Sequence, residues 1–193
     1  MGKAPKIGFN PLILILAVLV GLMSCDDTDF ERGEFGPISC ENDNISIDEA
    51  DLHLVINGKG FTGIELDCIR AGINCNISIE AEDIVLINCG ECIRAEGNGE
   101  VTLWAFGDIE CDAIDDGISA RGGAAIRLNA IEDIAIFSIE GNGIKAEDMS
   151  TVGLGTITGT CIIDGPAGDI VRDDTAVVGT GGCNEIDFLE DVD

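Results

Sequence analysis

Basic and aromatic side chains are scarce in this chain of 193 residues. It has 10 Lys and Arg against 37 Asp and Glu, a formal charge of −27, and its aromatic residues are 7 Phe and one Trp. A balance this acidic argues against nucleic-acid binding, because a phosphate backbone requires a basic surface. With so few rings, the core must be aliphatic. Pro is rare (4) but Gly is abundant (26), and apolar residues occur throughout, so the composition is not that of a disordered protein.

The first 24 residues are typical of a secretory signal. Lys3 and Lys6 precede an apolar run over residues 11–23, which is shorter than the roughly 20 residues of a membrane-spanning helix. The run ends in Leu22-Met23-Ser24-Cys25, which resembles the lipobox of bacterial lipoproteins. The resemblance implies cleavage before Cys25, lipidation of its thiol and attachment to a membrane through the lipid. An ordinary signal with a chance cysteine is the alternative.

Acidic residues follow Cys25 directly, at positions 26, 27, 29 and 31. Such residues resemble lipoprotein sorting signals, which imply retention at the inner membrane in some bacteria and display on the outer surface in others. We expect display. Loss of Lys3 and Lys6 leaves 8 basic residues against 37 acidic ones, a formal charge of −29. The remaining length suits one domain.

The mature chain repeats itself about every 25 residues. Cys68-Ile69-Arg70-Ala71 recurs unchanged at 92–95, as Gly-Ile-Ser-Ala at 117–120 and as Gly-Ile-Lys-Ala at 143–146, at intervals of 24, 25 and 26 residues. A second segment recurs in step, at 45–47, 77–79, 101–103, 126–128 and 152–154. Each segment alternates apolar and polar residues with the period of a strand. The repeats predict an all-β protein, a short right-handed parallel β-helix of about five coils. A β-sandwich is the structural alternative.

The repeat also suggests how the chain is divided. We expect residues 1–24 to be the signal peptide, 25–43 a lipid-anchored tether and N-terminal cap, and 44–165 the β-helix. Residues 166–193 would form a C-terminal cap and acidic tail. Such caps would cover strand edges that otherwise invite aggregation.

Eight cysteines remain beside Cys25, an even number that favours disulfides in an exported protein. Coils stack about 4.8 Å apart, so residues of one column become neighbours. Cys68 and Cys92 share a column, and this Cα separation permits a disulfide. Cys161 and Cys183 could attach the tail to the last coil. Inward columns supply the core: Ile69, Ile93, Ile118 and Ile144, and Ala71, Ala95, Ala120 and Ala146.

The outward column of the first strand contains the one tryptophan. Trp104 stands there between Glu80 and Asn129, and Arg127 lies beside it. An exposed ring among hydrogen-bonding groups is a candidate sugar-stacking site. The alternative is a tryptophan that lies under the N-terminal segment or a cap.

The outward column of the third strand is basic. It contains Arg70, Arg94 and Lys145, and it could hold a carboxylated or sulfated polysaccharide. The alternative, which we favour, is that these cations pair with neighbouring acids. The nearest acids are Asp67, Glu91 and Glu96.

Acidic residues recur at two turns. One column contains Asp51, Asp83, Asp108 and Asp133, and the other contains Asp67, Glu91 and Asp116 with Asn142. Stacked carboxylates repel unless they are hydrogen-bonded or bridged by a hard cation such as Ca²⁺. Asp112, Asp115 and Asp116 form the densest cluster and are the candidate Ca²⁺ ligands. Asp side chains also cap turns by accepting backbone N–H bonds, which needs no metal.

The middle strand has apolar outward positions. They are Val55, Val85, Ile87, Ala135 and Phe137, and Glu110 and Asp112 interrupt them. This strip is either a partner surface or an area that the acidic tail covers.

The segment Asp115-Asp116-Gly117-Ile118-Ser119-Ala120, echoed at 141–146, is similar to coils of β-helical, carbohydrate-binding-type domains of bacterial lipoproteins. The similarity covers residues 62–165 and implies extracytoplasmic glycan contact, without assigning a binding residue. We therefore expect a non-enzymatic surface lipoprotein that presents a β-helix face to a glycan or another surface partner. The alternatives are a β-helical polysaccharide lyase or hydrolase acting on acidic glycans, and a structural envelope or adhesion spacer.

Overall fold

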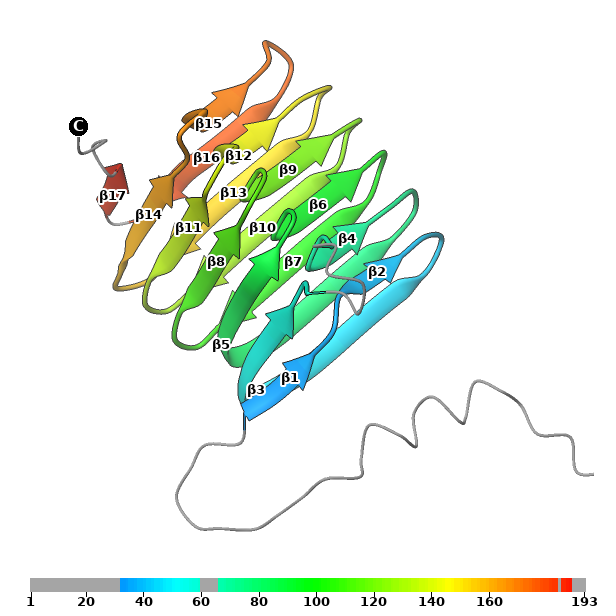
Figure 1. Cartoon of the computed structure of the whole chain (residues 1–193), viewed down its shortest axis with the longest axis vertical. Coiled ribbons are helices and arrows are strands. Elements are labelled where there is room, and N and C mark those ends of the chain that lie inside the picture. The colour runs from blue at the N-terminus through cyan, green and yellow to red at the C-terminus, as the bar shows by residue number, and fades with distance from the viewer. Residues whose placement is uncertain (1–31, 60–65, 184, 189–193) are drawn as a thin grey trace, which may run out of the picture.

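A computed structural model of the chain describes residues 32–59, 66–183 and 185–188. Every regular element in these residues is a β-strand, and all strand pairs are parallel. The strands wind into a solenoid of about five turns that stack from β1 at one end to β15–β17 at the other (Figure 1). The predicted parallel β-helix is therefore confirmed.

Each coil has three faces, which we call the first, second and third face in chain order. The first face comprises 44–49 of β3 (Asn44–Asn57), 76–81 of β5 (Asn76–Cys89), β7 (Glu100–Ala105), β10 (Ala125–Ala130), β13 (Thr151–Thr156) and β16 (Val177–Gly182). The second face comprises β1 (Arg32–Phe35), the later halves of β3 and β5, β8 (Ile109–Ala113), β11 (Ile134–Ser138), β14 (Thr160–Asp164) and β17 (Glu185–Phe188). The third face comprises β2 (Ile38–Cys40), β4 (Ile69–Ala71), β6 (Ile93–Glu96), β9 (Ile118–Arg121), β12 (Asn142–Ala146) and β15 (Gly168–Arg172).

The core is built from inward columns of aliphatic side chains. Ile69, Ile93, Ile118 and Ile144 pair in register on consecutive strands of the third face, and so do the four alanines two positions later. These isoleucines are at most 1% exposed. The largest fully buried side chains are all Leu or Ile, so the predicted aliphatic core is confirmed. Removal of this apolar surface from water is the main source of stability, at roughly 25 cal/mol per Å².

Asparagines shape the turn from the third face to the next coil. Asn42 and Asn74 both adopt the left-handed backbone region, with φ of 54° and 53°. The side-chain amide of Asn74 donates to Oδ1 of Asn42 at 3.0 Å, and that of Asn98 donates to Oδ1 of Asn74 at 2.6 Å. Asn tolerates this conformation better than most residues, and the amide ladder holds the turns of successive coils in step.

Four disulfides connect consecutive coils. They are Cys40–Cys75, Cys68–Cys89, Cys92–Cys111 and Cys161–Cys183. The pairing of Cys161 with Cys183 is thus confirmed.

The predicted bond between Cys68 and Cys92 is wrong. Cys68 bonds to Cys89 and Cys92 to Cys111, with Cα separations of 5.3 Å and 5.9 Å. Cys68 and Cys92 do share a column, but paired parallel strands point their Cβ atoms in the same direction rather than toward one another. The partner of each lies on the second face of the next coil, across the corner, where the two side chains converge.

Parallel pairing continues beyond the segment 44–165 at both ends. β1 and β2 lie within residues 25–43 and pair with β3 and β4. β15, β16 and β17 lie within residues 166–193 and pair with β12, β13 and β14. The disulfides are consistent with an extracytoplasmic protein. The part of the chain that the structure describes contains no helical segment that could span a membrane. The predicted signal and Cys25 lie outside the described residues.

Candidate functional site

The first face places Trp104 between Glu80 and Asn129. The three residues are register partners on β5, β7 and β10. Trp104 points outward, because Leu103 and Ala105 on either side of it are fully buried. All three side chains of the column are half-buried, so their polar and aromatic edges are accessible to a ligand.

Arg127 joins this group from the next strand. It is exposed and pairs in register with Thr102, two positions before Trp104 on the same outward side. The structure therefore brings together all four residues that were predicted to surround a sugar.

Phe106 extends the apolar part of this surface and is absent from the predicted site. It stands two residues after Trp104, at the corner between the first and second faces, and is half-buried. Ile131 and Ile157 occupy the same position on the next two coils, as successive backbone hydrogen bonds at this corner show. The alternation of inward and outward residues would have placed Phe106 on the outer surface, but it ends at Gly107, directly after Phe106, and therefore indicated the position of Phe106 only weakly.

The first face becomes a bare backbone surface beyond Asn129. Its register partners on β13 and β16 are Gly155 and Gly182, while Gly153 and Gly179 follow Arg127. At these four positions, beyond Asn129 and Arg127, no side chain rises from the surface.

The basic column of the third face is largely neutralised. Arg94 contacts Glu96 at 2.6 Å and Glu91 at 3.4 Å, and Arg70 contacts Glu96 at 3.3 Å. Arg121 also pairs with Glu96. Partial burial raises the pKa of Glu96, but hydrogen bonds from Arg94 and Arg121 outweigh it and lower that pKa to about 2.

Lys145 completes the column and lies 3.7 Å from Glu147. The cations Arg70, Arg94, Arg121 and Lys145 thus have carboxylate partners, as the ion-pair alternative predicted. Arg172, at the end of this face, donates to the carbonyl oxygen of Ala176. A polyanion would have to compete with these internal carboxylates.

Glu91 sits at the corner before Arg94, and its pKa shifts in the opposite direction from that of Glu96. Burial raises its pKa to about 7, and the nearby carboxylates of Asp67, Asp116 and Asp115 add to the effect that Arg94 opposes. Its Oε2 atom is buried without a hydrogen-bond partner.

One acidic column is a hydrogen-bond ladder. Asp83 Oδ1 accepts the N–H of Asp108 at 2.8 Å, Asp108 accepts that of Asp133 at 2.8 Å, and Asp133 accepts that of Thr160 at 2.6 Å. Asp51, which was expected in this column, is not part of it. A register shift in β3 between Glu49 and His53 instead places His53 beside Asp83, and the Nδ1 atom of His53 contacts the Asp83 carboxylate.

The candidate calcium ligands have separate environments. Asp112 points outward from β8, Asp115 is exposed in the following turn, and Asp116 accepts two hydrogen bonds from Asn142. Within the part of the chain that the structure describes, no group of three or more His, Cys, Asp or Glu side chains could hold a metal ion.

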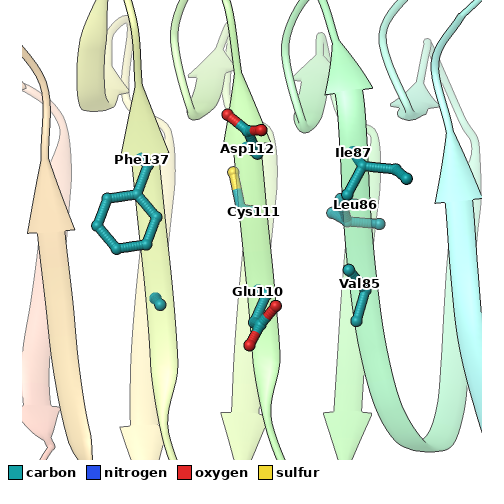
Figure 2. A pocket seen from close by; sticks show the side chains of 8 residues that line it. Val85, Leu86, Ile87, Glu110, Cys111, Asp112 and Phe137 are labelled. Carbon is teal, nitrogen blue, oxygen red and sulfur yellow. The ribbon is translucent and has the colours of Figure 1, made fainter.

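The second face carries a shallow hollow of about 190 Å³. Figure 2 shows Glu110 and Asp112 on its middle strand, with Phe137 on one neighbouring strand and Val85 and Ile87 on the other. These residues belong to the apolar strip that was predicted for the middle strand.

Compared with known proteins, the chain matches no protein-family model, no curated protein and no solved structure.

Proposed function

We propose that this protein is an exported, lipid-anchored lipoprotein displayed on the outer surface of the cell envelope, and that its first face binds glycan without catalysis. The lipobox-like segment ending at Cys25 supports the anchor. The four disulfides support a location outside the cytoplasm.

The observation that carries the proposal is the outward column of Glu80, Trp104 and Asn129. The apolar face of a sugar ring stacks on the indole, while ring hydroxyls exchange hydrogen bonds with the neighbouring amide and carboxylate. Arg127 supplies donors from the adjacent position. Phe106 widens the apolar platform at the corner.

The face favours an uncharged glycan. Glu80 and its exposed register partner Asp48 together outweigh the charge of Arg127, so the site has no positive surplus that would attract a polyanion. The basic column of the third face, which could have attracted an acidic polysaccharide, has its cations paired with Glu96 and Glu147. The same pairing occupies the Arg and Lys side chains that a polysaccharide lyase of this shape would use.

A glycan array with and without Ca²⁺ tests the proposal. We expect binding to neutral oligosaccharides that is independent of Ca²⁺ and that Trp104→Ala abolishes. Trp104→Phe, which keeps a ring, should retain part of it. Phe137→Ala removes an aromatic ring from the second face and is the matched control, which should bind like the unaltered protein.

Two results would contradict the proposal. Failure of the protein to bind any glycan would favour a structural spacer. Release of unsaturated products from uronate polymers, detected by their ultraviolet absorbance, would instead favour the lyase.

A further inference from the structure

The hollow on the second face combines apolar walls with an acidic centre (Figure 2). Val85 and Ile87 of β5 form one wall, and Ala135 and Phe137 of β11 form the other. The strand between them, β8, presents Glu110 and Asp112, both of which are exposed. The small side chain of Ala135 leaves room beside Glu110, its register partner.

These two carboxylates differ from those of the third face in having no cation nearby. Among the basic side chains that the structure describes, none forms an ion pair with either one. The outward positions in register with Glu110 are occupied by Glu34, Val55, Val85, Ala135 and Ile162. Those beside Asp112 in the next column are Phe137 and Asp164. The area around the hollow is thus apolar and negatively charged, and His53, a base on the same face, contacts Asp83 instead.

The spacing of the two acids suggests the shape of a ligand. Residues two apart on a strand lie on the same side, about 6.6–6.8 Å apart. Two basic residues that are separated by one residue in an extended peptide have the same spacing and also share one side.

We propose that this hollow binds an extended segment of a partner protein in which two basic residues flank a single intervening residue. Each cation pairs with one of the carboxylates of β8. The aliphatic stems cover Val85 and Ile87, and a guanidinium group stacks on Phe137. The C-terminal segment of this chain is a poor occupant, because residues 185–193 contain five acids and no base, and would be repelled.

Fluorescence anisotropy of labelled peptides, titrated with the full chain, tests this inference. The first peptide contains Arg-Val-Arg between Gly and Ser residues. The second has the same composition with the two arginines adjacent, which directs them to opposite sides of an extended backbone. We expect the first peptide to bind more tightly, and added salt to weaken its binding.

Substitutions locate the binding on the second face. Glu110→Gln and Asp112→Asn should each weaken binding of the first peptide about threefold, as loss of an exposed ion pair does. The double variant should bind the first peptide no more tightly than the unaltered protein binds the peptide with adjacent arginines. Phe137→Ala should also weaken it. Asp174→Asn removes one exposed negative charge from the turn after β15 and is the matched control, which should bind normally. Trp104→Ala should also bind normally, so failure of the glycan proposal would leave this result unaffected.

Three outcomes would overturn the inference. Equal affinity for both peptides would mean that the peptides respond only to the overall charge of the protein. The same conclusion would follow if Asp174→Asn weakened peptide binding as much as Glu110→Gln or Asp112→Asn. Self-association of the chain that Phe137→Ala disrupts, measured by sedimentation, would mean that a second copy occupies the hollow. No measurable binding of the first peptide would also contradict it.

Discussion

The carboxylate of Asp83 accepts a hydrogen bond from the backbone N–H of Asp108, one coil later, at 2.8 Å. Asp108 does the same for Asp133, so a column of like charges becomes a series of backbone caps. Each carboxylate satisfies an N–H at a corner, where strand pairing is interrupted. The repulsion that suggested a bridging cation is therefore offset by hydrogen bonds.

Substitution of Asp108 should reveal this role. We expect Asp108→Ala to lower the free energy of unfolding by about 1–2 kcal/mol, because it leaves the N–H of Asp133 without its acceptor. Glu132→Ala, which removes an exposed carboxylate at the same corner, should change it by less than about 0.5 kcal/mol. Urea denaturation measures both. A large rise in stability on adding Ca²⁺ would show instead that the column binds a metal.

The disulfide connectivity can be tested by peptide mapping. Digestion of the non-reduced protein should yield peptides that join Cys68 to Cys89 and Cys92 to Cys111. Replacement of Cys92 and Cys111 together by Ser should reduce stability by about 3 kcal/mol, since the bond closes a loop of 19 residues. A peptide that joins Cys68 to Cys92 would contradict this arrangement.

Glu91 should make the stability depend on pH near neutrality. Its pKa rises from 4.5 to about 7 on folding, so the folded protein binds more protons between these values and stability falls as the pH rises through them. Glu91→Gln should therefore stabilise the protein above pH 7 by about 2 kcal/mol, allowing for partial exposure, and change little below pH 4.5. Thermal unfolding between pH 4 and 8 measures this. Equal effects of the variant at all pH values would refute the assignment.

Glu96 should show the opposite dependence. Its pKa falls from 4.5 to about 2 on folding, so its ion pairs stabilise the protein above pH 4.5, and this contribution disappears as the pH falls toward 2. Because the group is accessible to solvent, we expect Glu96→Gln to cost only about 1 kcal/mol at pH 7. The carboxyl titration can be followed directly by NMR. A pKa near 4.5 for Glu96 would mean that Arg94 and Arg121 do not form these ion pairs with Glu96 when the protein is in solution.

Two glycines on neighbouring coils should respond differently to alanine. At Gly153 an added Cβ would have no atom within 4 Å, so Gly153→Ala should be neutral or stabilise the strand by up to about 1 kcal/mol. At Gly141 the Cβ would lie 2.6 Å from the backbone carbon of Asp115. Gly141→Ala should therefore destabilise the protein, and a comparison of unfolding temperatures would reveal the difference. Similar temperatures for both variants would contradict this packing.

The fold was predictable from two patterns in the sequence. The repeat indicates which residues stack on neighbouring coils, and the alternation indicates which of their side chains point into the core. Ile69 and Ile93 are 24 residues apart, and both the period and the inward position of each follow from the printed sequence. The column of Glu80, Trp104 and Asn129 followed from the same two rules.

Other features could not be predicted from the sequence, because they depend on local departures from the repeat and on the directions of side chains. Column positions give the separation of two Cα atoms, but not the direction of their Cβ atoms, so Cys68 was assigned the wrong partner. The register shift in β3 displaced Asp51, since it breaks the count of residues per coil. Burial of Glu91 is a three-dimensional property of the corner, and its charge alone suggested an exposed residue.

The cross-links are unevenly distributed along the chain. Three of them tie the coils between Cys40 and Cys111, and the fourth begins only at Cys161, so no loop closed by a disulfide encloses residues 112–160. A single proteolytic nick in this stretch would leave two covalently separate fragments, held together by strand pairing and the aliphatic core alone. A pulling force applied to the two ends could likewise extend residues 112–160 fully, whereas the disulfides would keep the chain segments inside their loops from extending.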